Sequence, residues 1–326
     1  MNPLHTLLSS TFLGTPSWFW LAFIAIVLAL LVFDLGVLHR DQHEIEMRES
    51  LLLYSGYFSV GLLFGGWVWW QLGATKALEF YTGFLIEQSL SMDNVFVMAM
   101  ILGFFGIPRR YQHRVLFWGI LGVIVLRALM IGLGTALIQQ FDWVLYLFGA
   151  FLLFTGVKML FSSQEQHPDL EQNPLLRFLK RHIRICAELH DGRFLVRLHD
   201  PATGHQLLYA TPLLLALVLI ELADLLFAVD SVPAVFAITQ DPFIVYTSNI
   251  FAILGLRSLY FALAALMHRF IYLKYALALV LIFIGGKIFL HDVLGQVPAL
   301  VSLGVTLGVL AAGVVLSLLR TRDKTA

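Results

Sequence analysis

The chain has 326 residues, of which 59% are hydrophobic and only 13% are charged. A soluble domain carries about 25% charged residues, so this composition excludes an ordinary soluble protein. Lysine and arginine together equal aspartate and glutamate in number, which gives no electrostatic basis for binding nucleic acid. The single cysteine, Cys186, excludes an intrachain disulfide and a zinc site built from cysteines.

Apolar runs of about 20 residues or more recur along the chain, the length that a helix needs to cross about 30 Å of hydrocarbon. We therefore predict an all-α polytopic membrane protein, one domain over residues 1–326, with about nine transmembrane helices and no separate soluble domain. No lysine or arginine precedes the first span and no small-residue cleavage site follows it, so we expect a retained helix. The predicted spans are 18–38, 49–72, 77–104, 115–136, 143–161, 209–238, 245–267, 273–290 and 298–319.

Lysine and arginine between the spans predict the orientation, because basic residues are enriched in cytoplasmic connections. Alternate connections contain 16 basic residues, whereas the connections on the other side contain only Lys76. We therefore predict an N-terminus outside and a C-terminus in the cytoplasm. The longest cytoplasmic connection covers 162–208, where we expect an amphipathic surface helix near 175–184 and a β-hairpin built from 193–198 and 206–209.

Two parts of the sequence contain charged residues in the same order and in similar surroundings. The matched pairs are Glu87 with Asp224, Asp93 with Asp230, Arg127 with Arg257, and Lys158 with Lys287. The two units, about 77–161 and 209–290, hold three spans each, so the second unit enters the membrane from the opposite side. We predict an inverted repeat, which in transporters places the substrate site near the midplane, between the repeats.

Five acidic residues lie well inside the third and sixth spans, where an ionised carboxylate without partners costs several kcal/mol. These acids are Glu87, Asp93, Glu221, Asp224 and Asp230. Only Arg127 and Arg257 are basic residues at comparable depth. Ion pairs with these two arginines therefore leave some of the five carboxylates without a partner. Lys158 and Lys287 lie near span ends and can reach the membrane surface. We expect the four basic residues to be structural or coupling charges, and the surplus acids to bind a ligand.

The oxygen atoms near these acids indicate which ligand they bind. Pro233 cannot donate to the carbonyl of Val229, so we expect the sixth span to be kinked or broken beside Asp230. Freed carbonyls, the Asn94 amide and carboxylates are hard donors that suit Mg²⁺, Ca²⁺ or Mn²⁺, and no histidine lies in the middle of a span. We predict a divalent-cation site at Asp93 and Asp230, completed by Glu87, Asp224, Glu221 and Asn94.

Transport of such an ion needs an energy source. The sequence contains no phosphate-binding loop and no ATPase domain. Export of a divalent cation against an inside-negative potential costs about 4.6 kcal/mol per 100 mV, which counter-movement of protons on the same carboxylates would offset. We expect no enzyme activity and no permanent cofactor. The expected partners are the lipid bilayer and the transported ion, and the sequence predicts no particular protein partner.

Three motifs are similar to those of a known family. They are Glu87-Gln-Ser-Leu-Ser-Met-Asp93-Asn94, Phe227-Ala-Val-Asp230-Ser-Val-Pro-Ala and Thr247-Ser-Asn-Ile-Phe-Ala-Ile-Leu-Gly-Leu-Arg257-Ser-Leu-Tyr. Over nearly its whole length the chain resembles the TerC family of bacterial inner-membrane proteins, above all its nine-helix, Alx-like branch. The resemblance implies a LysE-type exporter built from inverted three-helix repeats, with functional acids at Glu87, Asp93, Asp224 and Asp230. It also implies manganese efflux and, in older naming, tellurium resistance.

Two other functions are compatible with these residues. The first is a membrane scaffold or assembly factor of the tellurium-resistance type. The second is an intramembrane aspartyl protease, in which two aspartates share a proton. Such proteases usually contain Tyr-Asp and Gly-x-Gly-Asp, whereas Asp93 and Asp230 lie in Met-Asp-Asn and Val-Asp-Ser. Metal accumulation in a deletion strain distinguishes export from both alternatives.

Overall fold

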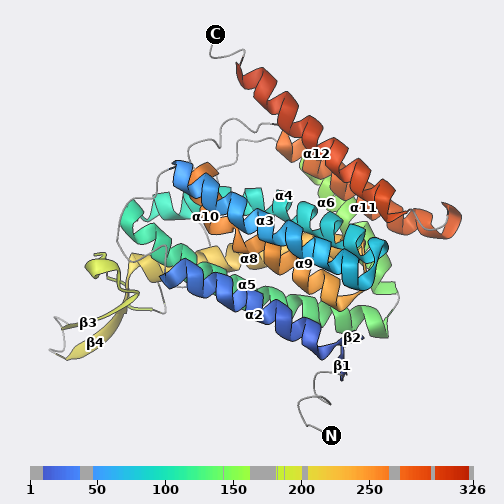
Figure 1. Ribbon diagram of the computed structural model, residues 1–326. Helices are drawn as coiled ribbons and strands as arrows, with labels where there is room; N and C mark the ends of the chain where they lie inside the picture. Colours follow the sequence, from blue (N-terminus) through green and yellow to red (C-terminus); the bar gives the residue numbers. More distant parts are fainter. Residues whose placement is uncertain are drawn as a thin grey trace, which may run out of the picture.

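The computed structural model describes residues 10–36, 47–141, 143–161, 181, 183–186, 188–199, 205–263, 272–294 and 298–322. Most of these residues are helical, and the helices pack into one bundle (Figure 1). The helices are α2 (Ser17–Gly36), α3 (Met47–Leu72), α4 (Ala74–Phe104), α5 (Arg109–Gln140), α6 (Trp143–Phe161), α8 (Pro212–Phe236), α9 (Pro242–Leu254), α10 (Leu256–Leu263), α11 (Leu273–Leu294) and α12 (Ala299–Arg322), with a short 3₁₀ turn η2 (His190–Gly192).

Several of these helices are suited to a membrane. Within the described ranges, five are long and apolar enough to cross one, namely Arg48–Leu72, Arg109–Gln140, Trp143–Phe161, Pro212–Phe236 and Leu300–Ser317. Shorter apolar stretches lie in α2, α9 and α11. The predicted all-α membrane protein is therefore confirmed.

Two predicted spans differ from the structure. The sixth span was predicted to be kinked or broken beside Asp230; α8 is one continuous helix through Pro233 and ends three residues later at Phe236, so it is not broken there. Pro233 lies in the last turn, so only three helical residues follow the position whose backbone hydrogen bond is lost. The predicted span 245–267 is instead divided into α9 and α10 at Gly255. A side chain at Gly255 would meet the ring of Tyr54 at 3.3 Å, so α3 packs closely against this break.

Two hairpins lie at opposite ends of the bundle (Figure 1). The first pairs β1 (Thr11–Phe12) with β2 (Thr15–Pro16), just before α2. The second pairs β3 (Leu195–His199) with β4 (Gln206–Ala210), just before α8, and confirms the hairpin predicted in the connection 162–208. The amphipathic helix predicted near 175–184 lies largely outside the described residues.

α6 and α11 pack with their backbones in direct contact at two glycines. A Cβ atom on Gly156 would lie 2.8 Å from the carbonyl oxygen of Ala278, and one on Gly285 would lie 2.8 Å from that of Gly149. Each helix therefore supplies one glycine that approaches a backbone carbonyl of the other helix. The two helices run antiparallel to each other at this contact. Because a backbone carbonyl cannot turn away as a side chain can, these two positions admit only glycine.

This contact gives a stability prediction with a control in the next residue. Gly285→Ala should destabilise the protein by about 1–3 kcal/mol, because the added methyl forces α6 and α11 apart. Gly286 has nothing within 4 Å of its Cβ position, so Gly286→Ala should leave stability unchanged or raise it slightly. Thermal unfolding of both variants in the same detergent checks the prediction, and equal melting temperatures would contradict it.

Candidate ion-binding site

Four helices bring polar side chains to one place in the middle of the bundle. α4 packs against α8 and α9, and α5 packs against the same two helices. Glu87 on α4, Arg127 on α5, Asp224 on α8 and Asn249 on α9 meet there, and each has at most 1% of its surface exposed. Each of the first three lies near the middle of its helix, far from both ends of the bundle.

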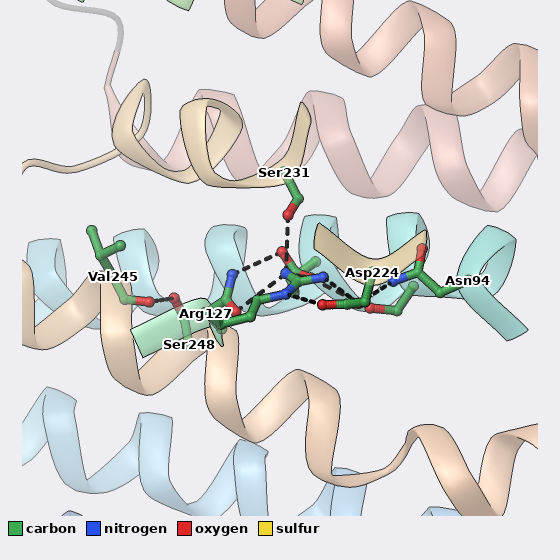
Figure 2. Close-up of polar contacts among 9 residues, drawn as sticks. Asn94, Arg127, Asp224, Ser231, Val245 and Ser248 are labelled. Atoms are coloured by element: carbon green, nitrogen blue, oxygen red, sulfur yellow. Dashed lines mark hydrogen bonds and ion pairs between the residues drawn. The ribbon is translucent and has the colours of Figure 1, made fainter. Parts of the chain in front are cut away.

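Arg127 is the centre of this cluster (Figure 2). Its Nε and Nη2 donate to the two carboxylate oxygens of Asp224 at 3.1 and 3.0 Å, a bidentate pair. Its Nη1 pairs with Oε1 of Glu87 and also donates to the Ser231 hydroxyl at 3.0 Å and to the Asn249 side-chain carbonyl at 3.3 Å. One guanidinium therefore neutralises two buried carboxylates from two different helices.

The remaining acceptor of Glu87 is also satisfied. Asn249 donates from Nδ2 to Oε2 of Glu87 at 2.9 Å, while it accepts from Arg127 through its carbonyl oxygen. Asn249 was not among the residues that the sequence predicted for the cation site. The available signal was Thr247-Ser248-Asn249, three polar residues in succession that are fully buried in an otherwise apolar helix.

Two contacts between α4 and α8 match each other. Asn94 on α4 donates from Nδ2 to Oδ1 of Asp224 on α8 at 2.9 Å. Glu87 on α4 and Ser231 on α8 are likewise neighbours, because Nη1 of Arg127 binds both. In the sequence match, Asn94 corresponds to Ser231 and Glu87 to Asp224, so each contact becomes the other when the two helices are exchanged.

Two buried oxygen atoms near Asp224 accept no hydrogen bond within the described part of the chain. They are Oδ1 of Asn94 and Oε2 of Glu221. Glu221 lies three residues before Asp224 and therefore on the same face of α8. A buried acceptor without a donor is costly, and a cation placed near both atoms would satisfy them.

The other predicted site residues have different surroundings. Asp93 lies on α4, Asp230 on α8 and Arg257 on α10, but their side chains are outside the described residues. Lys158 is exposed in the last turn of α6, as expected for a lysine at a helix end. Lys287 is half-buried and donates to the Ser302 hydroxyl at 3.1 Å. Among the described side chains, no group of three or more His, Cys, Asp or Glu is placed to hold a metal ion.

A cavity of about 1140 Å³ lies where α4 begins and α8 ends. We call it the vestibule. Its polar lining residues include Lys76, Glu79, Thr82, Thr239, Asp241 and Lys287. Thr82 precedes Glu87 by little more than one helical turn, so the vestibule ends roughly 7–8 Å along α4 from the buried cluster.

Lys76 links two acids at the mouth of the vestibule. Its ammonium lies 3.0 Å from Glu79 on the same helix and 3.2 Å from Asp241, which caps the start of α9. Thr239 donates to the same Glu79 carboxylate at 2.6 Å. Like Arg127, Lys76 is therefore a cation held between one acid of α4 and one from the second part of the chain.

The fold and the buried cluster define an integral membrane protein with a charged centre between its helices. The chain belongs to the TerC family, described as integral membrane proteins, whose family pattern matches residues 72–325.

Relatives cover almost the whole chain. A membrane protein of Rickettsia bellii, described as uncharacterised, is 47% identical over 301 residues, which are 92% of this chain and 97% of that protein. A protein of Escherichia coli K12, provisionally named membrane-bound redox modulator Alx, is 47% identical over 306 residues, 91% of this chain and 92% of its own. No solved structure matches the chain significantly.

Proposed function

We propose that this TerC-family protein exports a hard divalent cation, with Mn²⁺ as its substrate, across the inner membrane of a bacterium. The observation that supports this most directly is the buried cluster around Arg127. Charged groups inside a membrane protein are costly and mark ion pathways by default. This cluster joins helices from two separate parts of the chain, which is where transporters bind their substrates.

The unsatisfied oxygens indicate what the substrate is. Within the described part of the chain, Asn94 Oδ1 and Glu221 Oε2 accept no hydrogen bond, and both oxygen atoms favour a cation over an anion. The candidate ligands of this site are oxygen atoms, which suit Mn²⁺, Mg²⁺ or Ca²⁺. The choice of Mn²⁺ rests on the family resemblance.

Arg127 already neutralises Glu87 and Asp224, so these two acids are not free to hold a second full charge. We propose that Asp93 and Asp230 bind the ion directly, and that Glu87, Asp224, Glu221 and Asn94 complete the surroundings. Asp93 is next to Asn94, and Asp230 is next to Ser231, so both aspartates belong to the same turns as residues of the cluster.

The inverted repeat is part of the proposal, because alternating access needs two related halves. Two sets of contacts support it. The glycine contacts between α6 and α11 exchange when Gly156 is matched with Gly285, and the α4–α8 contacts exchange when Glu87 is matched with Asp224. The helix pairs α4–α9 and α5–α8, which a two-fold axis would also exchange, both pack closely.

The proposed orientation gives the vestibule a role. With the N-terminus outside and the C-terminus in the cytoplasm, the start of α4 and the end of α8 face the outside. The vestibule is then the exit for the ion.

A labelling experiment tests this orientation. Residues 162–208 should face the cytoplasm, because they contain six basic residues. Ser163 lies in this connection, outside the described residues. In a background with Cys186 replaced by serine, Ser163→Cys should resist an impermeant thiol reagent in intact cells and react after lysis. Reaction before lysis would reverse the orientation and place the vestibule on the cytoplasmic side.

The function itself is tested by the metal content of cells. Under manganese load, cells that lack the protein should accumulate several-fold more manganese than cells that produce it, with magnesium unchanged. Equal manganese content would remove the export proposal and favour the scaffold function. Loss of a specific cleavage product without a change in metal would instead favour a protease.

A further inference from the structure

The β3–β4 hairpin has an outer face that combines leucine with arginine. In its register, Leu195 lies opposite Ala210 and Arg197 lies opposite Leu208. Residues directly opposite each other point to the same side of a sheet, so Leu195, Arg197 and Leu208 share one face. Leu195 is 46% exposed, Leu208 is 54% exposed, and Arg197 is exposed as well. The other face is buried or half-buried and consists of Val196, Leu198, Leu207 and Tyr209.

The base of the hairpin is fixed to the start of α8. Thr211, which is fully buried, donates from its hydroxyl to the carbonyl of Arg193 at 2.7 Å and from its backbone nitrogen to that of Phe194 at 3.0 Å. Ala210 pairs with the segment before the hairpin, because its nitrogen donates to Arg184 and its carbonyl accepts from Cys186. The orientation of the outer face is therefore set relative to a membrane-spanning helix.

The length of α8 brings the hairpin close to the lipid headgroups. A helix of 25 residues is about 37 Å long, a few ångströms more than the hydrocarbon layer on each side. Leu208 precedes Pro212, the first residue of α8, by four residues, which span at most about 14 Å in a strand. The hairpin projects obliquely beyond the outline of the bundle (Figure 1). Its outer face is therefore within reach of the headgroup layer beside the protein.

This end of the bundle is rich in arginine. Arg114 at the start of α5 lies over the ring of Phe194 at 5.7 Å, which joins α5 to the base of the hairpin. The exposed arginines of α5 and of the hairpin segment are Arg109, Arg110, Arg114, Arg181, Arg184, Arg193 and Arg197. None of them forms an ion pair with another described residue. The described acids of 183–199 are only Glu188 and Asp191, so positive charge predominates here.

We propose that the outer face of the β3–β4 hairpin binds the anionic phospholipid surface of the membrane that the protein spans. Leu195 and Leu208 enter the boundary between headgroups and acyl chains, and Arg193 and Arg197 bind lipid phosphates. Apolar side chains flanked by basic ones are the combination that binding to such a surface requires. The anchored hairpin holds the start of α8 at the membrane surface. This inference does not depend on the proposed export of metal.

A fluorescent label on the outer face tests the proposal. In a background with Cys186→Ser, Leu208→Cys is labelled with an environment-sensitive fluorophore, and the full-length protein is placed in nanodiscs. Discs of phosphatidylcholine are compared with discs that also contain phosphatidylglycerol. With phosphatidylglycerol, the emission should shift to shorter wavelength and be quenched by lipids that carry a nitroxide near the headgroup. A label at Glu188→Cys, a side chain that is 85% exposed, should report water in both discs.

Arginine variants test the charged part of the contact. Each arginine near an anionic surface strengthens binding about fivefold, so Arg193→Gln with Arg197→Gln should favour the detached hairpin by about 25-fold. Lys158→Gln removes an exposed basic residue from another helix and should leave the label unchanged. Salt should weaken the effect of phosphatidylglycerol in the protein with all its arginines, because the Debye length falls to about 3 Å at 1 M.

The outcomes that overturn the proposal are distinct. Equal emission and quenching in the two kinds of disc would show that the arginines do not select anionic lipid. A shifted emission that nitroxide lipids do not quench would show that protein covers this face, such as a second copy of the chain. A label at Leu195→Cys, on the same face, must agree with the label at Leu208→Cys. If the double arginine variant does not fold, the salt titration decides, and an effect of phosphatidylglycerol that salt leaves unchanged refutes the contact.

Discussion

Replacing Arg127 by glutamine should strongly reduce the amount of folded protein in the membrane. Glutamine cannot neutralise a carboxylate, so Glu87 and Asp224 would both remain charged and unpaired in a place with at most 1% exposure. Removing one partner of a buried ion pair typically costs about 3–5 kcal/mol, and here one residue serves two acids. Membrane fractions and thermal unfolding in detergent should show lower abundance and a lower melting temperature.

Two variants control this prediction. Lys158→Gln removes a lysine at an exposed helix end and should leave both quantities unchanged. Arg127→Lys keeps the charge but has no planar fork, so it should fall between the wild type and Arg127→Gln. Normal abundance and melting temperature of Arg127→Gln would mean that the two acids do not need a cation and are uncharged in the folded protein.

Asparagine at Asp93 or Asp230 should abolish manganese efflux while the protein still accumulates. Asparagine keeps the size and one oxygen donor of aspartate but removes the charge. Loss of one charged ligand contact is worth about 1.5–3 kcal/mol, which corresponds to roughly a 10- to 100-fold weaker interaction with the ion. Efflux from manganese-loaded cells, normalised to the amount of protein in the membrane, measures the effect.

Asp191→Asn is the matched control, because Asp191 lies in η2, outside the helix bundle. Its backbone has a φ of 51°, which asparagine adopts as readily as aspartate. This variant should export manganese normally. Normal efflux from well-expressed Asp93→Asn and Asp230→Asn would show that these aspartates are structural, and the scaffold function would then be favoured.

The sequence predicted the parts of the fold that depend on local pattern. Apolar runs of membrane length predicted the helical class, and two alternating stretches around a turn predicted the β3–β4 hairpin. The division of one predicted span at Gly255 was not predicted. A glycine inside a helix costs only about 1 kcal/mol, so the sequence pattern does not reveal the break.

The sequence predicted most of the residues that form the buried cluster, but only some of the contacts between them. The match between the two parts of the chain brought Glu87, Asp224 and Arg127 into one hypothesis, and the structure brings all three together. That one guanidinium binds both acids could not be predicted, because it depends on the packing of α4, α5 and α8. Asn249 was missed for the same reason, since a buried amide gives no charge signal.

The contact between α6 and α11 has the form of an isologous interface, in which residue i of one partner meets residue j of the other and j meets i. Two identical chains related by a two-fold axis make such interfaces, and there any substitution appears on both sides at once. In a single chain each side can change alone. In the proposed inverted repeat, a glutamate can then replace a phenylalanine in one half only, as Glu221 and Phe84 illustrate three residues before the matched acids Asp224 and Glu87. A dimer of identical chains could not acquire that difference between the two faces of the membrane.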